Sequence, residues 1–205
     1  MSALPPIPEV RGTAVVVPGD DIDTDRIIPA RFLKCVTFDD LGPALFHDER
    51  FEADGTSKGH PLDAPEARGA TILISGVNFG SGSSREHAPQ SIHKAGFRAI
   101  VAGSFAEIFF GNATTLGMPC VTLDADDLAV LKATVASEPA TEVVVDVANR
   151  EVRAGDRVFP ATLPDGAHGA LLEGRWDPLG DLLAAGDDVE RVARDLGYLP
   201  AEPGA

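Results

Sequence analysis

The 205-residue chain contains only two cysteines, Cys35 and Cys120, which lie far apart and form no C-x-x-C pair. This scarcity excludes a disulfide framework and leaves too few thiolates for a zinc or iron–sulfur site held by this chain alone. No apolar run approaches the length that spans a membrane, and the first residues, MSALPPIPEVRG, lack the basic and apolar regions of a signal peptide. We therefore expect a cytosolic protein without a cofactor of its own.

Basic residues are also scarce, since 17 lysines and arginines stand against 32 aspartates and glutamates and the net charge is −15. Nucleic acids and anionic membranes are bound through clusters of positive charge, so neither is an expected partner. A small anionic substrate remains compatible with this balance, because a local arginine cluster suffices to bind it. The length allows one sizeable hydrophobic core.

Short apolar runs alternate with helical patterns through the middle of the chain. Five runs are typical of buried strands: Thr13–Val17, Ala70–Ser75, Arg98–Ala102, Pro119–Leu123 and Glu142–Val147. Helical patterns follow three of these strands: Gln90–Gly96, with Pro89 in its first turn, Phe105–Phe110 and Asp126–Ala136. The alternation predicts an α/β fold built from parallel β–α–β units, with Glu142–Val147 as the next strand.

The chain is expected to form one domain with four parts: an N-terminal arm 1–52, a mobile loop 53–69, an α/β body 70–160 and a helical tail 161–205. In the arm, Gly42–Phe51 is consistent with a short helix, whereas the loop shows no periodicity. We predict a capping box at Ser104 and Glu107 and a helix stop at Gly111. A hairpin return strand at 151–153, a strand at 157–159, and helices near 166–172 and 179–196 complete the pattern.

The stretch 76–89, GVNFGSGSSREHAP, joins the strand Ala70–Ser75 to a helix. Its glycines permit close approach to a ligand, and the N-terminus of a helix favours anions. Arg85 beside free N–H groups is explained if an anion lies between them. The stretch fails to match G-x-G-x-x-G, the P-loop and G-x-S-x-G. It predicts an anion-binding loop with Ser83 and Ser84 as candidates, with a tight turn and ordinary N-caps as the alternative.

The segment 20–25, DDIDTD, carries four aspartates. A calcium-binding EF-hand loop starting at Asp20 would need glycine and glutamate where this chain has Asp25 and Arg31. Local Asx turns are therefore predicted instead of a calcium site. Four histidines are scattered singly, without the spacing of metal ligands: His47, His60, His93 and His168. His87 is expected to be a capping or packing residue in the first turn of the helix that follows the loop.

Taken together, these motifs resemble those of one family. GVNFGSGSSREHAP followed by GFRAIVAGSFAEIFFGN is similar to the swivelling domain of the aconitase superfamily. DIDTDRIIPARFL (Asp21–Leu33), ALFHDERF (Ala44–Phe51) and the pattern of 174–199 extend the likeness to the small subunits of 3-isopropylmalate dehydratases. The resemblance implies a swivelling β/β/α domain with a mostly parallel sheet. It also implies a hydro-lyase of leucine biosynthesis that acts only with a large subunit, whose three cysteines hold a [4Fe–4S] cluster.

The same resemblance implies functions for individual residues. Ser83 corresponds to the catalytic base, which acts as an alkoxide, while Ser84 and Arg85 correspond to residues that bind a substrate carboxylate. Asp25 corresponds to an aspartate that organises the site beside residues of the large subunit. The loop that reads the distinguishing side group of the substrate corresponds to four residues: Phe32, Leu33, Lys34 and Cys35.

The sequence after this loop keeps other substrates open. Where the isopropylmalate branch commonly carries Arg-Thr-Gly, this chain reads TFDDLG at 37–42. Homocitrate, homoaconitate and methylmalates such as citramalate are therefore alternative di- or tricarboxylate substrates. A non-catalytic dicarboxylate-binding module and a serine hydrolase are alternatives from other classes. The retained Ser83 and Arg85 count against the first, and the missing nucleophile elbow counts against the second.

Overall fold

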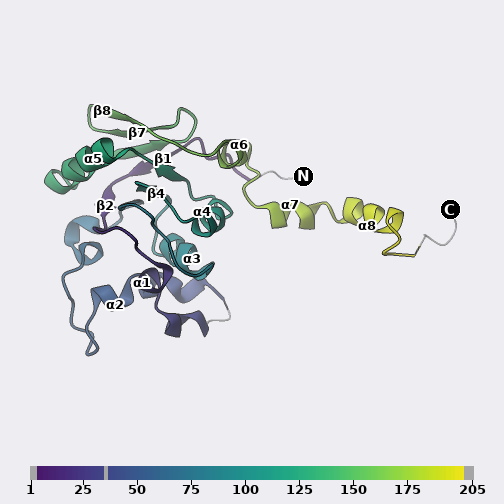
Figure 1. The fold of residues 1–205 in the computed structure, drawn as a ribbon, viewed down its shortest axis with the longest axis horizontal. Helices are drawn as coiled ribbons and strands as arrows, with labels where there is room; N and C mark the ends of the chain where they lie inside the picture. The colour runs from purple at the N-terminus through teal and green to yellow at the C-terminus, as the bar shows by residue number, and fades with distance from the viewer. Residues whose placement is uncertain (1–3, 35–36, 201–205) are drawn as a thin grey trace.

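The computed structural model describes residues 4–34 and 37–200, and its strands form two four-stranded sheets (Figure 1). The parallel sheet has the order β2-β3-β4-β5 and contains Ala14–Val16, Ile72–Ile74, Ala99–Ala102 and Cys120–Thr122. The antiparallel sheet has the order β1-β6-β7-β8 and contains Glu9–Gly12, Val143–Asp146, Glu151–Ala154 and Arg157–Pro160. All five strands predicted from apolar runs are confirmed.

The described α-helices are α1 (Thr24–Ile27), α2 (His47–Arg50), α3 (His87–Lys94), α4 (Glu107–Thr114), α5 (Ala125–Ser137), α6 (Asp165–Glu173), α7 (Pro178–Ala184) and α8 (Gly186–Asp195). Short 3-10 turns span Ala30–Lys34, Asp39–Ala44, Pro61–Asp63 and Pro65–Ala67. Within the described ranges, we find no helix that is both long and apolar enough to cross a membrane.

The parallel sheet lies between two hydrophobic layers, and β3 and β4 are buried at every position. One face packs against α3 and α4 in a cluster that includes Leu73, Ile100, Ala88, Ile92 and Phe109. The other face packs against α5 and the antiparallel sheet in a cluster that includes Ile72, Ile74, Leu128, Val145 and Val152. Burial on both faces explains why these strands read as continuous apolar runs. The β/β/α layering implied by the resemblance is confirmed.

The N-terminal arm contributes one strand to each sheet, because β2 pairs with β3 and β1 pairs with β6. One prediction about strand partners is wrong. The run Glu142–Val147 does not continue the parallel sheet; β6 instead forms an antiparallel hairpin with β7, which confirms the predicted return strand at 151–153. A turn of four residues joins these two strands, which is too short for a parallel crossover.

The loop 53–69 contains two short 3-10 turns at Pro61–Asp63 and Pro65–Ala67, although its sequence shows no periodicity. Pro61 and Pro65 each begin a 3-10 turn, in which the fixed φ of proline suits the first position. Arg50 anchors the first turn through an ion pair with Asp63 of 2.6 Å and a hydrogen bond to the carbonyl of Leu45.

The predicted capping box at Ser104 is also wrong. Helix α4 begins at Glu107, and Gly111 lies inside it. The amide of Phe79 donates to the carbonyl of Ser104, and the amide of Ala106 donates to the carbonyl of Phe79. This extended pairing with the loop 76–89 keeps the residues before Glu107 out of the helix.

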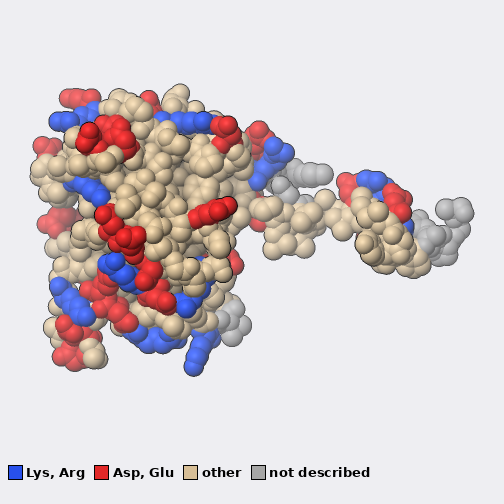
Figure 2. Space-filling model, viewed as in Figure 1, with Lys and Arg blue, Asp and Glu red and all other residues tan. Residues whose placement is uncertain are grey.

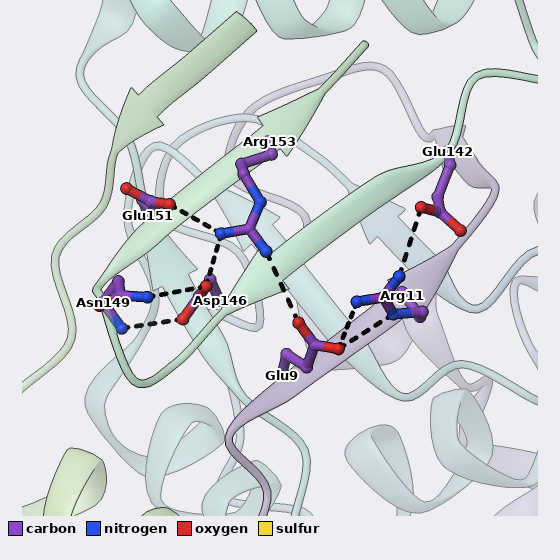
Figure 3. Close-up of polar contacts among 7 residues, drawn as sticks. All are labelled: Glu9, Arg11, Glu142, Asp146, Asn149, Glu151 and Arg153. Carbon is purple, nitrogen blue, oxygen red and sulfur yellow. Dashed lines mark hydrogen bonds and ion pairs between the residues drawn. The ribbon is translucent and has the colours of Figure 1, made fainter. Parts of the chain in front are cut away.

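An ionic network crosses the antiparallel sheet (Figure 3). Arg153 on β7 contacts Asp146 on β6 and lies 3.5 Å from Glu9 on β1, while Arg11 pairs with Glu9. Burial raises the pKa of Asp146, but hydrogen bonds from Asn149 and Arg153 outweigh it and lower that pKa overall. The network therefore joins β1, β6 and β7 through side chains as well as backbone hydrogen bonds.

The C-terminal helices α7 and α8 project away from the two sheets (Figure 1). One helix was predicted near 179–196, but the structure divides it at Ala185. Large apolar side chains of this C-terminal region are exposed, among them Leu179, Leu182, Leu183, Val189, Val192 and Leu196. In Figure 2 the charged residues of α8 gather on its upper side and leave the lower side uncharged.

Candidate active site

The glycine-rich loop 76–89 lies directly beside the N-terminal motif. The amide of Gly80 donates to the carbonyl of Ile22 at 2.8 Å, and the amide of Thr24 donates to the carbonyl of Ser81 at 2.8 Å. Asp23 and Ser81 also form a parallel β-bridge. Segments from the arm and from the α/β body thus meet where β3 ends and α3 begins.

Most aspartates of the segment 20–25 form hydrogen bonds that stabilise the contact between the N-terminal motif and the loop 76–89. Asp20 accepts a hydrogen bond from the amide of Val77, and Asp21 accepts one from the Asn78 side chain, both at 2.8 Å. Asp23 caps α1 by accepting from the amide of Arg26. The local turn prediction is therefore correct for Asp23 and wrong for Asp20 and Asp21, whose partners lie in the distant loop.

Gly80 fixes the shape of the loop. Its φ is +79°, and a Cβ added there would lie 2.2 Å from Cγ of Phe109 on α4. A side chain at this position would meet both the left-handed backbone and a buried ring. The close approach of loop to helix depends on the absence of a side chain.

We expect Gly80→Ala to lower the free energy of unfolding by roughly 2–5 kcal/mol, the sum of backbone strain and overpacking. Gly111→Ala is the matched control, because its Cβ would enter open space on α4. Alanine favours a helix interior over glycine by about 1 kcal/mol, so this control should be neutral or stabilising. Urea denaturation of the purified chain measures both, and equal stability of the two variants would contradict the packing argument.

Ser83 lies in the bend before α3 and is an exposed residue. Its hydroxyl is 3.1 Å from Oγ1 of Thr24, and its amide donates to the same oxygen at 3.2 Å. Thr24 itself is buried, with 1% of its surface exposed. The hydroxyl of an exposed residue that is held by a buried hydroxyl is suited to exchange a proton with a bound molecule.

Arg85 and Asp25 are in contact through Nη1 and Oδ1, so the structure brings together two residues that the resemblance implies. The Arg85 side chain is 28% exposed and that of Asp25 is 60% exposed. Ser84 is exposed, and in the described ranges no acceptor contacts its amide or the amide of Glu86. A guanidinium and two free amides before a helix can bind a carboxylate.

The residues expected to read the substrate lie in the 3-10 turn Ala30–Lys34. Phe32 and Leu33 are half-buried against the core, and the Phe32 ring lies 5.1 Å from the ring of His47. Lys34 is exposed, and Cys35 lies outside the described residues. Among the described residues, no hydrogen bond, ion pair or ring contact joins this turn to Ser83, Ser84 or Arg85. The structure brings Asp25 to the loop but leaves the turn without such a contact.

Within 4–34 and 37–200, no group of three or more His, Cys, Asp or Glu side chains could hold a metal ion. Cys120 is buried in the core, and burial raises the pKa of its thiol, which disfavours a thiolate ligand. The ring of His87, the first residue of α3, packs edge-on against Phe38 at 5.0 Å, as its predicted packing role requires. The described side chains do not fit an iron–sulfur cluster.

Thr24 is the site residue that the sequence did not single out. It lies in the motif Asp21–Leu33, next to Asp25, but its contact with Ser83 joins positions 59 residues apart. A threonine beside an implied site residue was a weak signal for this contact.

The comparisons with known proteins extend over nearly the whole chain. A family model described as the Aconitase C-terminal domain matches residues 5–126. The chain is 56% identical to a 3-isopropylmalate dehydratase small subunit from Thermus thermophilus, over 92% of this chain and 94% of that one. It is 47% identical to the protein of the same name from Synechocystis, over 94% and 95%. A crystal structure of 3-isopropylmalate dehydratase from Methanocaldococcus jannaschii matches with a TM-score of 0.63 and 25% identity, over 87% of this chain and 99% of that one.

Proposed function

The chain belongs to the 3-isopropylmalate dehydratase small subunits, and from this we infer that it is the small subunit of a hydro-lyase that interconverts 2- and 3-isopropylmalate in leucine biosynthesis. The observation that carries the assignment is the pair of contacts that join the N-terminal motif to the loop 76–89, Thr24 with Ser83 and Asp25 with Arg85. These contacts hold a hydroxyl that can exchange a proton and a guanidinium that can bind a carboxylate. We also propose that the protein acts in the cytosol, without nucleic acid or membrane partners.

We propose that Ser83 is the base. Its oxygen takes the proton from the substrate carbon next to a carboxylate, and the electron pair of that C–H bond forms a double bond as the neighbouring C–O bond breaks. Water then adds back across the double bond with the positions of hydroxyl and hydrogen exchanged. A serine alkoxide is costly near neutral pH, and Arg85 with nearby free amides supports it by favouring negative charge.

Ser84 and Arg85 are proposed to bind a substrate carboxylate, and Asp25 to hold the guanidinium in place. The contact between Asp25 and Nη1 leaves other N–H groups of Arg85 for the substrate. Negative charge that builds on the substrate during proton removal would then be met by two parallel hydrogen bonds.

The departing hydroxyl needs a Lewis acid, which this chain does not provide among its described residues. We propose that the large subunit supplies it as a [4Fe–4S] cluster held by three cysteines. The small subunit alone is therefore half of an active site. It binds and deprotonates but does not remove the hydroxyl.

Phe32, Leu33, Lys34 and Cys35 are proposed to read the side group of the substrate once the large subunit is bound. Half-buried Phe32 and Leu33 offer apolar surface, which favours an isopropyl group over a second polar arm. Homoaconitate and citramalate remain the competing substrates because of the sequence at 37–42.

The test is anaerobic co-expression with the cluster-bearing large subunit, followed by assay on 2-isopropylmalate, homoaconitate and citramalate. We expect turnover of 2-isopropylmalate by the complex and none by either subunit alone. Preference for another of the three acids would correct the substrate. If the chain stays a monomer, binds dicarboxylates and never associates with a large subunit, a non-catalytic binding module would be the better interpretation. Labelling of Ser83 by a fluorophosphonate would indicate a hydrolase.

A further inference from the structure

Thr24 is the first residue of α1 and is fixed by backbone hydrogen bonds on both sides, although Asp23 is the residue that caps the helix. Its amide donates to the carbonyl of Ser81 at 2.8 Å, and its carbonyl accepts from the amide of Ile28 at 2.9 Å. Its side chain is buried and β-branched, which restricts χ1. The Oγ1 atom therefore has a fixed position within hydrogen-bonding distance of the Ser83 hydroxyl.

The hydrogen bonds around Oγ1 of Thr24 indicate that its hydroxyl donates to an oxygen of Ser83. The amide of Ser83 donates to Oγ1 at 3.2 Å, so that oxygen already serves as an acceptor. The hydroxyl proton of Thr24 then has two acceptors within reach, the carbonyl oxygen of Ser83 at 3.3 Å and the hydroxyl oxygen of Ser83 at 3.1 Å. Both belong to the same residue.

The preferred acceptor depends on the charge of Ser83. While Ser83 keeps its proton, its hydroxyl can donate to Oγ1, and the Thr24 proton points to the carbonyl. When Ser83 is an alkoxide, its Oγ is the stronger acceptor, because a hydrogen bond to an ion is roughly twice as strong as a neutral one. A small rotation of the Thr24 hydroxyl is enough to make that bond.

We propose that Thr24 is a positioning residue for the base: it fixes the Ser83 hydroxyl and donates a hydrogen bond to the alkoxide. The inference rests on the proposed function, in which Ser83 takes the substrate proton. In the described part of the chain, Thr24 is the one side chain within hydrogen-bonding distance of Ser83 Oγ. Arg85, by contrast, is engaged by Asp25 through Nη1.

The matched variants are Thr24→Val, which keeps the shape and removes the hydroxyl, and Thr24→Ser, which keeps the hydroxyl. In the reconstituted complex we expect Thr24→Val to lower kcat roughly 10²- to 10³-fold with KM changed less than about two-fold, as for loss of one donor to a developing oxyanion. The primary isotope effect with substrate deuterated at the carbon that loses its proton should rise. Thr24→Ser should keep both values near those of the unchanged protein.

Three results overturn the inference. An unchanged kcat and isotope effect in Thr24→Val would show that the hydroxyl does not act on the base. Equal decreases in kcat for Thr24→Val and Thr24→Ser, with an unchanged isotope effect, would show that Thr24 has only a structural role. If Thr24→Val does not assemble, Thr24→Cys replaces it, because its thiol is only a weak donor, and a normal kcat there would also refute the inference.

Ser83→Ala in the same complex separates this inference from the proposed function. Full activity of Ser83→Ala would remove the proposed base itself. An inactive Ser83→Ala beside a fully active Thr24→Val would leave the base in place and refute the inference about Thr24 alone.

Discussion

Replacing Ser83 by alanine is expected to reduce kcat of the assembled complex by about 10²–10⁴-fold, the usual contribution of a general base. The variant loses the proposed proton acceptor while the backbone contacts of the loop remain, including the bond from the Ser83 amide to Thr24. Because the side chain is at the surface, no cavity forms and stability should be unchanged. Steady-state kinetics of the complex, with thermal unfolding of the variant chain, measure both effects.

Ser84→Ala is the comparison for Ser83→Ala. Ser84 is the adjacent serine and is exposed, but it is proposed to bind substrate and not to take its proton. We expect Ser84→Ala to act mainly on KM and to leave most of kcat. Undiminished turnover in Ser83→Ala, or the same large fall in kcat in both variants, would remove the distinction between the two serines.

The strands were predictable because their signal is local. Runs such as Ala70–Ser75 and Arg98–Ala102 are apolar throughout, as strands buried on both faces must be. The partners of the strands were not predictable in the same way. Whether Glu142–Val147 joins one sheet or the other depends on β1, more than a hundred residues away, and on the short turn to β7.

The loop 76–89 shows the same limit at the level of the site. Its glycines, serines and Arg85 indicated an anion site, and the family resemblance supplied the separate roles. Neither the residue pattern nor the family resemblance predicted the contact of Ser83 with Thr24, because it forms only when the fold brings the two segments together. The failed capping box at Ser104 has a related cause: a local signal was overridden by pairing with Phe79 of the loop.

Arg85→Lys is expected to lower kcat/KM by roughly 10- to 100-fold, chiefly through KM, because lysine keeps the charge but cannot form two parallel bonds to a carboxylate. Asp25 sharpens this effect. In the native chain it engages Nη1 and leaves N–H groups on the other guanidinium nitrogens for substrate, whereas the three N–H groups of a lysine lie on one nitrogen, which Asp25 and the substrate would have to share. The two carboxylates would then compete for one cation.

Arg98→Lys is the matched control for Arg85→Lys, since Arg98 lies beyond the opposite end of α3 and donates to the carbonyls of His93 and Phe97. Its kcat/KM should equal that of the unchanged complex. If Arg85→Lys behaved like this control, the guanidinium would not bind substrate, and its contact with Asp25 would be a surface ion pair worth about 0–1 kcal/mol. Neither variant changes the net charge. A decrease in kcat/KM for Arg85→Lys alone would therefore show that substrate affinity depends on the planar, two-pronged geometry of the guanidinium.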